Sequence, residues 1–279
     1  MSNLRELVAR TAVTVFGRRP AARFGQALSN WARLDVPNKI GKNGELLIQA
    51  TVLERTAGTN PVFFDVGANI GEWTLALLRR SSSSKPSRIS IHAFEPCDGT
   101  RQTLTEVLRN NDPDRSVTLL PVALSNASGS RSFYVIGSGA GRNSLYPNET
   151  TATTVESVET MTLDEYCAQN QIERIALLKI DTEGHDMNVM EGAKHLLAEH
   201  RIAVVQFEYN HLWVSARRYL KDVFEFATPL GYAVAKITPS GVEPYFKWHH
   251  ELETFREGNY ILATEEALSW FPSVRWWNA

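Results

Sequence analysis

The sequence predicts an α/β fold: a doubly wound, mostly parallel, seven-stranded sheet with helices on both faces, preceded by a helical N-terminal extension. Three observations predict it. Apolar runs of strand length alternate with amphipathic helical segments from residue 62 onward. Several of these runs end in an acidic residue. Residues 1–55, in contrast, are polar with helical periodicity. We therefore expect an extension at residues 1–58 and one domain at residues 59–279.

The N-terminal part is predicted to be helical. The stretch MSNLRELVARTAVTVFGRRP has the pattern of a short amphipathic helix, which we expect to pack onto the domain rather than to lie on a membrane surface. Its apolar run is too short to span a membrane and is not followed by a convincing cleavage site of a secretory signal. Further along, Leu46, Ile48 and Val52 place apolar side chains on one face of another helical segment.

Strands and helices alternate in the domain, as a parallel sheet with crossover helices requires. Buried strands are expected at 61–67, 88–96, 117–126, 175–184 and 202–210, with a closing pair at 232–239 and 259–265. Helices are expected at 73–80, 98–110, 162–171, 187–200 and 215–228, the third with Thr162 as its N-cap. Residues 127–160 are rich in Ser, Gly, Thr and Asn, which favours hairpin-like strands and a mobile loop.

The composition argues against several classes of protein. The 279 residues, 43% of them hydrophobic, suffice for a large core without disulfides or a structural metal. A net charge of −2 and the lack of a basic stripe argue against a nucleic-acid partner. Cys97 and Cys167 lack the spacing of a zinc site or a disulfide framework. Because no apolar run reaches about 18 residues, we expect no transmembrane segment and a cytoplasmic protein with reduced thiols.

The segment FFDVGANIGEWT joins the first strand of the domain to its first helix and predicts a ligand-binding turn. Gly67 and Gly71 allow a tight turn and close approach of a ligand, and the following helix offers free backbone N–H groups. The turn differs from the dinucleotide fingerprint, because Asn69 takes the middle position and the acids Asp65 and Glu72 flank it. Negative charge disfavours a pyrophosphate and favours an ammonium or a sulfonium group.

Other strand ends add to this site. Glu95 follows the last glycine of the turn by about 24 residues, near the spacing at which an acid binds ribose hydroxyls. A ribonucleoside with a cationic tail therefore fits, and S-adenosylmethionine has both features. Asp181 and Glu183 end the fourth strand and Glu208 ends the fifth, so acids gather at the edge where such sheets bind ligands. Lys179, inside the otherwise apolar fourth strand, is expected to pair with them.

A set of motifs resembles the FkbM-type family of S-adenosylmethionine-dependent class I methyltransferases: FFDVGANIGEWT, IHAFEPCDGTRQTL, PVALSNASGSRSFYV, TLDEYCA, IALLKIDTEGHDMNVMEGA and VVQFEYN. The resemblance covers about residues 60–265 and implies a Rossmann-like fold and methylation of sugars or secondary metabolites, often at oxygen. Under it, the cofactor-binding residues are Asp65, Gly67, Asn69, Gly71, Glu72, Trp73, Glu95, Pro96, Ser125 and Asp181. The reaction site would be lined by Asp181, Glu183 and Gly184.

The segment KIDTEGHD supplies the catalytic candidates, because a hydroxyl acceptor must lose its proton as it attacks the methyl group. His185 titrates nearest to neutral pH, although it is equally consistent with a solvated residue on the turn. Asp181 lies at the strand end itself, and crowding with Glu183 can raise a carboxyl pKa and make it a better base. Alternatively, Asp181, Glu183 and Glu208 hold a divalent cation, magnesium or calcium, that activates the hydroxyl.

Two segments are expected to contact the acceptor. One is the Gly- and Ser-rich loop 137–150, which can order over a substrate, and the other follows the fifth strand. The substrate candidates are Arg142, Asn143, Tyr146, Glu208, Asn210 and His211. Trp213 is expected in the core. The aromatic tail WFPSVRWWNA either packs back on the domain or meets a second subunit of a homo-oligomer.

The sequence therefore predicts an S-adenosylmethionine-dependent methyltransferase. The favoured reaction is O-methylation of a sugar, glycan or secondary metabolite by in-line transfer, assisted by a general base or a metal. One alternative is an N-methyltransferase that acts on a small molecule. Another is a nucleotide-binding oxidoreductase of Rossmann type, although it would prefer a third glycine and fewer acids at the turn. A binding module without catalysis gives no reason for acids at several strand ends.

Overall fold

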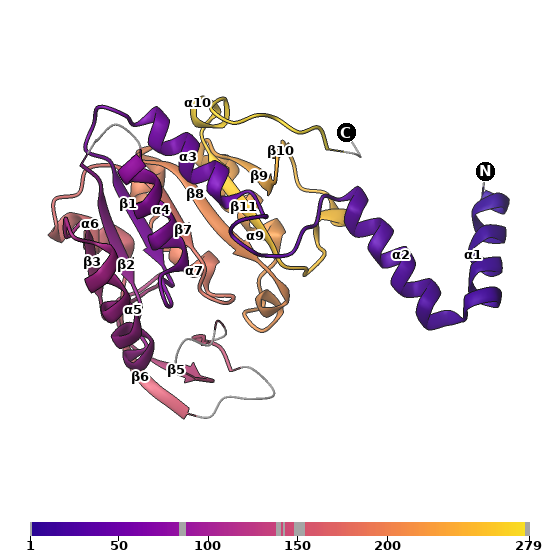
Figure 1. The fold of residues 1–279 in the computed structure, drawn as a ribbon, viewed down its shortest axis with the longest axis horizontal. Helices are drawn as coiled ribbons and strands as arrows, with labels where there is room; N and C mark the ends of the chain where they lie inside the picture. The colour runs from indigo at the N-terminus through magenta and orange to yellow at the C-terminus, as the bar shows by residue number, and fades with distance from the viewer. Residues whose placement is uncertain (1, 84–87, 138–140, 142, 148–153, 277–279) are drawn as a thin grey trace.

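The computed structural model describes residues 2–83, 88–137, 141, 143–147 and 154–276. The main strands are β1 (Val62–Val66), β2 (Ser90–Phe94), β3 (Val117–Leu120), β7 (Ile175–Ile180), β8 (Ile202–Tyr209), β9 (Ala233–Thr238), β10 (Gly241–Tyr245) and β11 (Gly258–Ala263). Within the described chain they form one eight-stranded sheet in the order β10-β9-β11-β8-β7-β1-β2-β3 (Figure 1). The run from β3 to β8 is parallel, whereas β11 is antiparallel to β8 and β9, and β10 to β9. The predicted doubly wound α/β fold is confirmed.

Helices cover both faces of this sheet. One face carries α3 (Glu45–Arg55), α4 (Glu72–Ser83), α5 (Asp98–Asn111) and α10 (Glu265–Leu268). The other carries α6 (Leu163–Gln169), α7 (Asp186–Glu191), α8 (Lys194–Ala198) and α9 (Leu220–Ala227). Short 3-10 turns are η1 (His211–Val214), η2 (Thr228–Leu230) and η3 (His250–Leu252). Because side chains alternate along a strand, Phe63 packs with the first set of helices and Phe64 with the second.

Some elements differ from the prediction. The sheet has an eighth strand, β10, which is not predicted from the sequence because Pro244 interrupts its strand pattern. Proline is tolerated in β10 because this strand lies at the edge of the sheet. The helix predicted at 187–200 is divided into α7 and α8. Gly192 ends α7, and only glycine fits there, because a Cβ would lie 2.0 Å from the carbonyl oxygen of Ser125. The helix expected from residue 215 begins only at Leu220.

A smaller sheet lies beside the main one. It consists of β4 (Ala123–Leu124), β5 (Gly129–Val135) and β6 (Thr154–Met161), in the order β4-β6-β5. The predicted hairpin-like strands are therefore confirmed as the antiparallel pair of β5 and β6. The strand expected at 117–126 is instead divided between the two sheets on either side of Pro121. Thr162 caps α6 as predicted, since its hydroxyl accepts a hydrogen bond from the N–H of Glu165.

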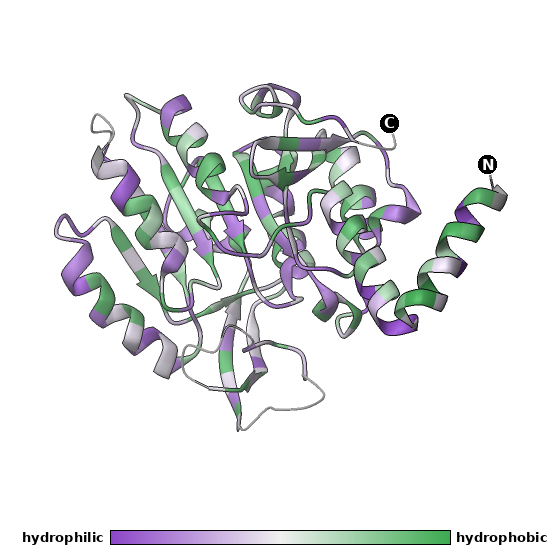
Figure 2. Cartoon of the chain, turned by 45° about the vertical axis from the view of Figure 1, so that its right-hand side comes forward, coloured by the Kyte–Doolittle hydropathy of each residue, from purple (hydrophilic) through white to green (hydrophobic). Residues whose placement is uncertain are grey.

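The first two helices, α1 (Ser2–Phe16) and α2 (Arg18–Ala32), extend away from the domain (Figure 1). They pack against each other, and α2 has no buried residue, so the expectation that the N-terminus packs onto the domain is wrong. Their exposed large apolar side chains are Leu4, Leu7, Val8, Val13, Val15, Phe16, Phe24, Leu28 and Trp31. Figure 2 shows such hydrophobic positions along α1. In contrast, α3 buries Ile48 and Val52 on the sheet, and the boundary at residue 58 stays a prediction.

The aromatic tail packs back onto the domain, one of its two predicted alternatives. Phe271 is buried, and the Trp276 ring lies 5.4 Å from that of Tyr245. Trp277 lies outside the described residues. Cys97 and Cys167 are free and buried. In the part of the chain that the structure describes, no helix is both long and apolar enough to cross a membrane.

Candidate active site

A cavity of about 230 Å³ opens beyond the carboxyl ends of β1, β2, β7 and β8, the edge at which the sequence predicts a ligand. Its carboxyl groups belong to Glu95, Asp181, Glu183, Glu208 and Glu257. Its amide groups belong to Asn38, Asn69 and Asn143. Apolar lining comes from Val66, Phe94, Val122, Leu124, Phe133 and Leu145. This mixture suits a ligand that combines a flat ring with polar and positively charged groups.

Positive φ angles shape the turn after β1. Gly67 has φ 76°, and a Cβ there would lie 1.9 Å from the carbonyl oxygen of Asp181. Asn69 has φ 48°, and its backbone N–H donates to Oε2 of Glu95 at 3.0 Å. Oε1 of Glu95 accepts from the N–H of Cys97 at 2.9 Å, although burial still raises the pKa of this carboxyl. The side-chain oxygen of Asn69 is buried without a hydrogen-bond partner among the described residues.

Lys179 balances part of the acidic charge. Its Nζ lies 3.1 Å from Oδ1 of Asp65 and 3.4 Å from Oδ2 of Asp181. Asp65 is fully buried, and its Oδ2 accepts a hydrogen bond from the Thr74 hydroxyl at 2.6 Å. Burial by itself would lower the pKa of Lys179, but the adjacent carboxylates, Asp65 first, raise it overall. The predicted pairing of Lys179 with the acids is therefore confirmed.

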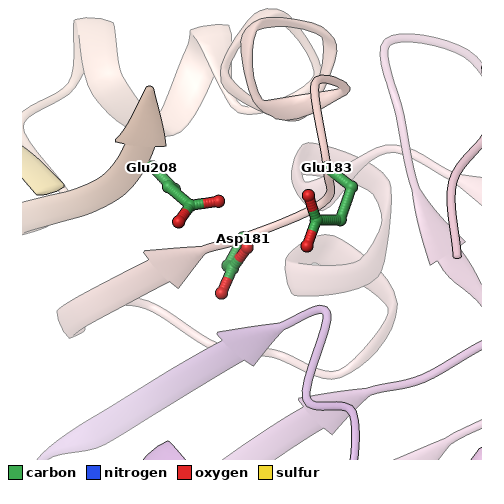
Figure 3. A group of neighbouring side chains, drawn as sticks. All are labelled: Asp181, Glu183 and Glu208. Carbon is green, nitrogen blue, oxygen red and sulfur yellow. The ribbon is translucent and has the colours of Figure 1, made fainter. Parts of the chain in front are cut away.

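A second group of carboxyls, which we call the acid corner, consists of Asp181, Glu183 and Glu208. Their side chains point toward one another (Figure 3), and one oxygen from each lies within 4.8 Å of the others. Burial, followed by the charge of Asp181, raises the pKa of Glu183 to about 9 and that of Glu208 well above its usual range. Asp186 behind them is raised to a pKa of about 7 for the same reasons. Such crowding is relieved by a proton or by a positively charged ligand.

Amide side chains orient the acid corner. Nδ2 of Asn210 donates to Oε2 of Glu208 at 2.8 Å, and Nδ2 of Asn38 contacts Oε1 of Glu208 at 2.5 Å. Asn38 also donates to Glu257 at 3.1 Å. The sequence motifs do not mark Asn38 or Glu257. Asn38 precedes α3 and lies 170 positions from Glu208, so only the folded chain brings them together.

His185 is held by hydrogen bonds on both sides of its ring. Nε2 lies 2.9 Å from the Ser125 hydroxyl and Nδ1 lies 3.3 Å from the Tyr146 hydroxyl. Only 1% of the residue is exposed, and this burial lowers its pKa to about 3. A His185 base is predicted from the sequence because an ordinary histidine has a near-neutral pKa. In the folded protein His185 does not have such a pKa. Its catalytic role stays a prediction, and the contacts favour a positioning role.

The predicted site residues divide into two sets. Those that line the cavity are Gly67, Asn69, Glu95, Pro96, Asn143, Asp181, Glu183, His185 and Glu208. Those that are not among its described lining residues are Asp65, Gly71, Glu72, Trp73, Ser125, Tyr146, Asn210 and His211. Asp65, Ser125 and Asn210 lie behind the wall as hydrogen-bonding or ion-pairing supports. Trp213 is fully buried, as predicted, and Arg142 lies outside the described residues.

The protein-family model described as "Methyltransferase FkbM domain" matches residues 65–260, which include every carboxyl group of the cavity. The match extends from the end of β1 to β11, and thus over most of the main sheet.

Proteins similar to the chain include two characterised sequences and a solved structure. "Methyltransferase sdnD" of Sordaria araneosa is 25% identical over 77% of this chain and 78% of its own length. "Hexuronic acid methyltransferase AglP" of Haloferax volcanii is 27% identical over 58% of this chain and 62% of its own length. The crystal structure of "Methyltransferase FkbM" from Methylobacillus flagellatus KT superposes with a TM-score of 0.46 and 13% identity, covering 77% of this chain and 47% of that one. At that TM-score the superposition adds nothing to the family match.

Proposed function

The chain belongs to the FkbM methyltransferase family, and we propose that it transfers a methyl group from S-adenosylmethionine to a hydroxyl of a sugar or another polyhydroxylated metabolite. The observation that carries this proposal is the acid corner, which lies in the same cavity as the turn after β1. Membership in a methyltransferase family sets aside the alternative of a Rossmann-type oxidoreductase. N-methylation remains the competing reaction.

The cavity fits this cofactor. S-adenosylmethionine, when bound, supplies a methyl carbon that a sulfonium centre activates. The unpartnered amide oxygen of Asn69 can accept a hydrogen bond from its ammonium group. Each carboxyl oxygen of Glu95 accepts one backbone N–H and keeps a lone pair for a ribose hydroxyl. The excess of carboxyl groups complements a sulfonium.

The protein then has two tasks, to orient the acceptor and to accept its proton. Orientation is worth about 7–11 kcal/mol of the barrier and a general base about 10²–10⁴-fold in rate. As the new O–C bond forms and the C–S bond breaks, the hydroxyl proton passes to a carboxylate, and we assign this role to Glu183. Beside a positive ligand, Glu183 ionises more readily than its raised pKa of about 9 implies. Asn210, with Nδ2 3.5 Å from Oε2, helps to hold it.

A divalent cation is the second arrangement that the acid corner supports. Three carboxyl oxygens within 4.8 Å of one another match the ligands that magnesium and calcium prefer. A cation held there would offset the repulsion among Asp181, Glu183 and Glu208 and would acidify a coordinated acceptor hydroxyl. Dependence of the activity on a cation distinguishes this arrangement from a proton-accepting Glu183.

The charge of the cavity also bears on the acceptor. One relative is named a hexuronic acid methyltransferase, so its acceptor carries a carboxylate. In this chain a carboxylate would approach Glu183, Glu208 and Glu257, and like charges repel. We therefore propose a neutral sugar or polyol as the acceptor. An acidic acceptor would need a cation that bridges its carboxylate and the acid corner.

Calorimetric titration tests the cofactor site. Wild-type protein should bind S-adenosylmethionine at micromolar concentration and should not bind NAD. Glu95→Gln should weaken binding at least tenfold, because it removes charge from two hydrogen bonds of the turn. His195→Gln, an exposed change on α8 outside the described lining, is the matched control and should bind as wild type does. Binding of NAD alone would contradict the proposal.

An acceptor screen tests the reaction. Neutral sugars, uronic acids and amines would be offered with labelled S-adenosylmethionine, with and without a chelator. We expect methylation of neutral hydroxyls, and Glu183→Gln should lower kcat by about 10²–10⁴-fold while cofactor affinity changes little. Loss with chelator and recovery with magnesium would assign the cation arrangement. Methylation of amines alone would refute O-methylation while leaving the cofactor site intact.

A further inference from the structure

The helical hairpin formed by α1 and α2 exposes apolar surface that the domain does not cover. Among the described residues, most of the exposed large apolar side chains lie on these two helices. Phe24 is 71% and Trp31 83% exposed, values usual for charged residues rather than aromatic ones. A groove between the helices is lined by residues such as Leu4, Val8 and Leu28. Contiguous apolar surface of this kind marks an interaction site.

The same hairpin is strongly basic. It carries Arg5, Arg10, Arg18, Arg19 and Arg23, with Glu6 as the single acid of residues 2–32. The whole chain has a net charge of −2, so this positive segment belongs to an otherwise acidic protein. Glu6 is also paired with Arg10 at 2.7 Å, and among the described residues the other four arginines of the hairpin form no salt bridge. Arginine on a helix that also exposes aromatic and aliphatic residues is the pattern of a surface that binds anionic lipid.

The hairpin is fixed to the domain at one end. Arg256 donates to the side chain of Asn30 near the end of α2. Nζ of Lys236 on β9 donates to the carbonyl of Arg33 at 2.8 Å and pairs with Asp35. These contacts hold the base of α2, so the exposed helices have a defined direction relative to the cavity.

We propose that the α1–α2 hairpin docks this protein on the surface of an anionic lipid bilayer. The apolar side chains would enter the boundary between headgroups and acyl chains, and the arginines would contact the lipid phosphates. A second copy of the chain is the other candidate occupant. A symmetric contact would place this basic patch against itself, and like charges oppose that arrangement. An anionic bilayer complements both features of the hairpin.

Vesicle sedimentation with the full chain tests the proposal. The probes are phosphatidylcholine vesicles with about 30 mol% phosphatidylglycerol, and vesicles of phosphatidylcholine alone. We expect at least tenfold tighter binding to the anionic vesicles, weakened several-fold in about 0.5 M salt. Equal binding to both vesicles, or no binding to either, would overturn the proposal.

Matched variants locate the contact. Phe24→Asp/Trp31→Asp should lower binding to anionic vesicles at least tenfold, and Arg18→Gln/Arg19→Gln should lower it several-fold. Phe246→Asp replaces an aromatic residue that is 84% exposed outside the hairpin, and it should bind as wild type does. All of these positions are exposed, so circular dichroism should report the same fold for each variant. If the double aspartate variant binds like wild type, or if it only converts a dimer to a monomer, the bilayer is not the occupant.

Discussion

The carboxyl of Asp65 and those of the acid corner lie at the same edge of the sheet, and they differ in what balances their negative charge. Asp65 is fully buried, its Oδ1 forms an ion pair with Nζ of Lys179 at 3.1 Å, and its Oδ2 accepts a hydrogen bond from Thr74. Glu183 and Glu208 face Asp181 instead, and within the described chain it is amide groups that hydrogen-bond to them. The charge of Asp65 is neutralised inside the protein, whereas the acid corner has more negative than positive charge.

This difference distinguishes residues that support the fold from residues that form the ligand site. Removing one partner of a buried ion pair lowers the free energy of unfolding by several kcal/mol, because the other charge stays buried without compensation. The Asp65–Lys179 pair therefore supports the turn after β1. An unbalanced group such as the acid corner destabilises the empty fold and persists where a ligand supplies the missing charge. Substitutions in the two groups should therefore change stability in opposite directions.

The largest effect is expected at the balanced pair. Asp65→Asn should lower the free energy of unfolding by about 3–5 kcal/mol, because it leaves Lys179 buried with Asp181 as its remaining acidic partner. Chemical denaturation followed by circular dichroism at neutral pH measures this change.

Two controls sharpen this result. Asp65→Leu/Lys179→Met removes both charges and should recover a large part of the loss. Glu199→Gln breaks the exposed pair of Glu199 with Arg201 and should cost less than about 1 kcal/mol. If Asp65→Asn costs no more than Glu199→Gln, the pair does not hold the fold.

The acid corner should respond in the opposite sense. Burial and the charge of Asp181 raise the pKa of Glu183 from 4.5 to about 9, so the folded state binds this proton more tightly than the unfolded state does. Its contribution to stability is full below pH 4.5 and is lost as the pH rises toward 9. Glutamine does not ionise, so Glu183→Gln avoids this loss of stability at high pH. The variant should raise the free energy of unfolding at pH 8 by about 1–3 kcal/mol.

Thermal unfolding at two pH values measures this gain. The variant should melt higher than wild type at pH 8 and close to it at pH 4, where Glu183 is protonated in both states. His211→Gln, an exposed change near the same edge, should leave the melting temperature unchanged at both values. A lower melting temperature for Glu183→Gln at pH 8 would mean that the acid corner stabilises the fold, contrary to the comparison.

The sequence predicts the acid corner but only one of the amide groups that orient it, Asn210. Asp181, Glu183 and Glu208 are found because each follows a buried strand, and parallel strands bring their carboxyl ends to one edge. Lys179 is found because a lone cation in an apolar strand needs a partner. Asn38 and Glu257 have no such local pattern, and long-range packing alone brings them to Glu208 and to the cavity.

The same reasoning explains the errors in the fold. The doubly wound, mostly parallel sheet follows from alternating strands and helices, but β10 is missed because its proline weakens the strand pattern. The break between α7 and α8 falls at Gly192, where the backbone lies close to that of Ser125, and local periodicity does not encode this approach. The exposed hairpin has the apolar pattern of a packed helix, so its sequence alone does not say what covers it.

The smallest predicted effect is on ligand preference. S-adenosylmethionine carries a sulfonium charge that S-adenosylhomocysteine lacks, whereas both carry the same amino acid group. As pH rises from 6 to 9, Asp186, with a pKa of about 7, and Glu183, with a pKa of about 9, lose protons and add negative charge. Binding of the sulfonium should then gain about three- to tenfold relative to binding of the neutral product.

Calorimetric titration of both ligands across this range measures the ratio of their dissociation constants, in which the titration of the shared amino group cancels. Glu183→Gln should flatten the pH dependence, and Asp65→Leu/Lys179→Met, which removes one acid and one base together, should preserve it. A flat ratio in wild type would mean that the acid corner keeps its protons when the cofactor binds. The surplus of carboxyls would then serve the acceptor or a cation, and the comparison of the two groups would still separate support from site.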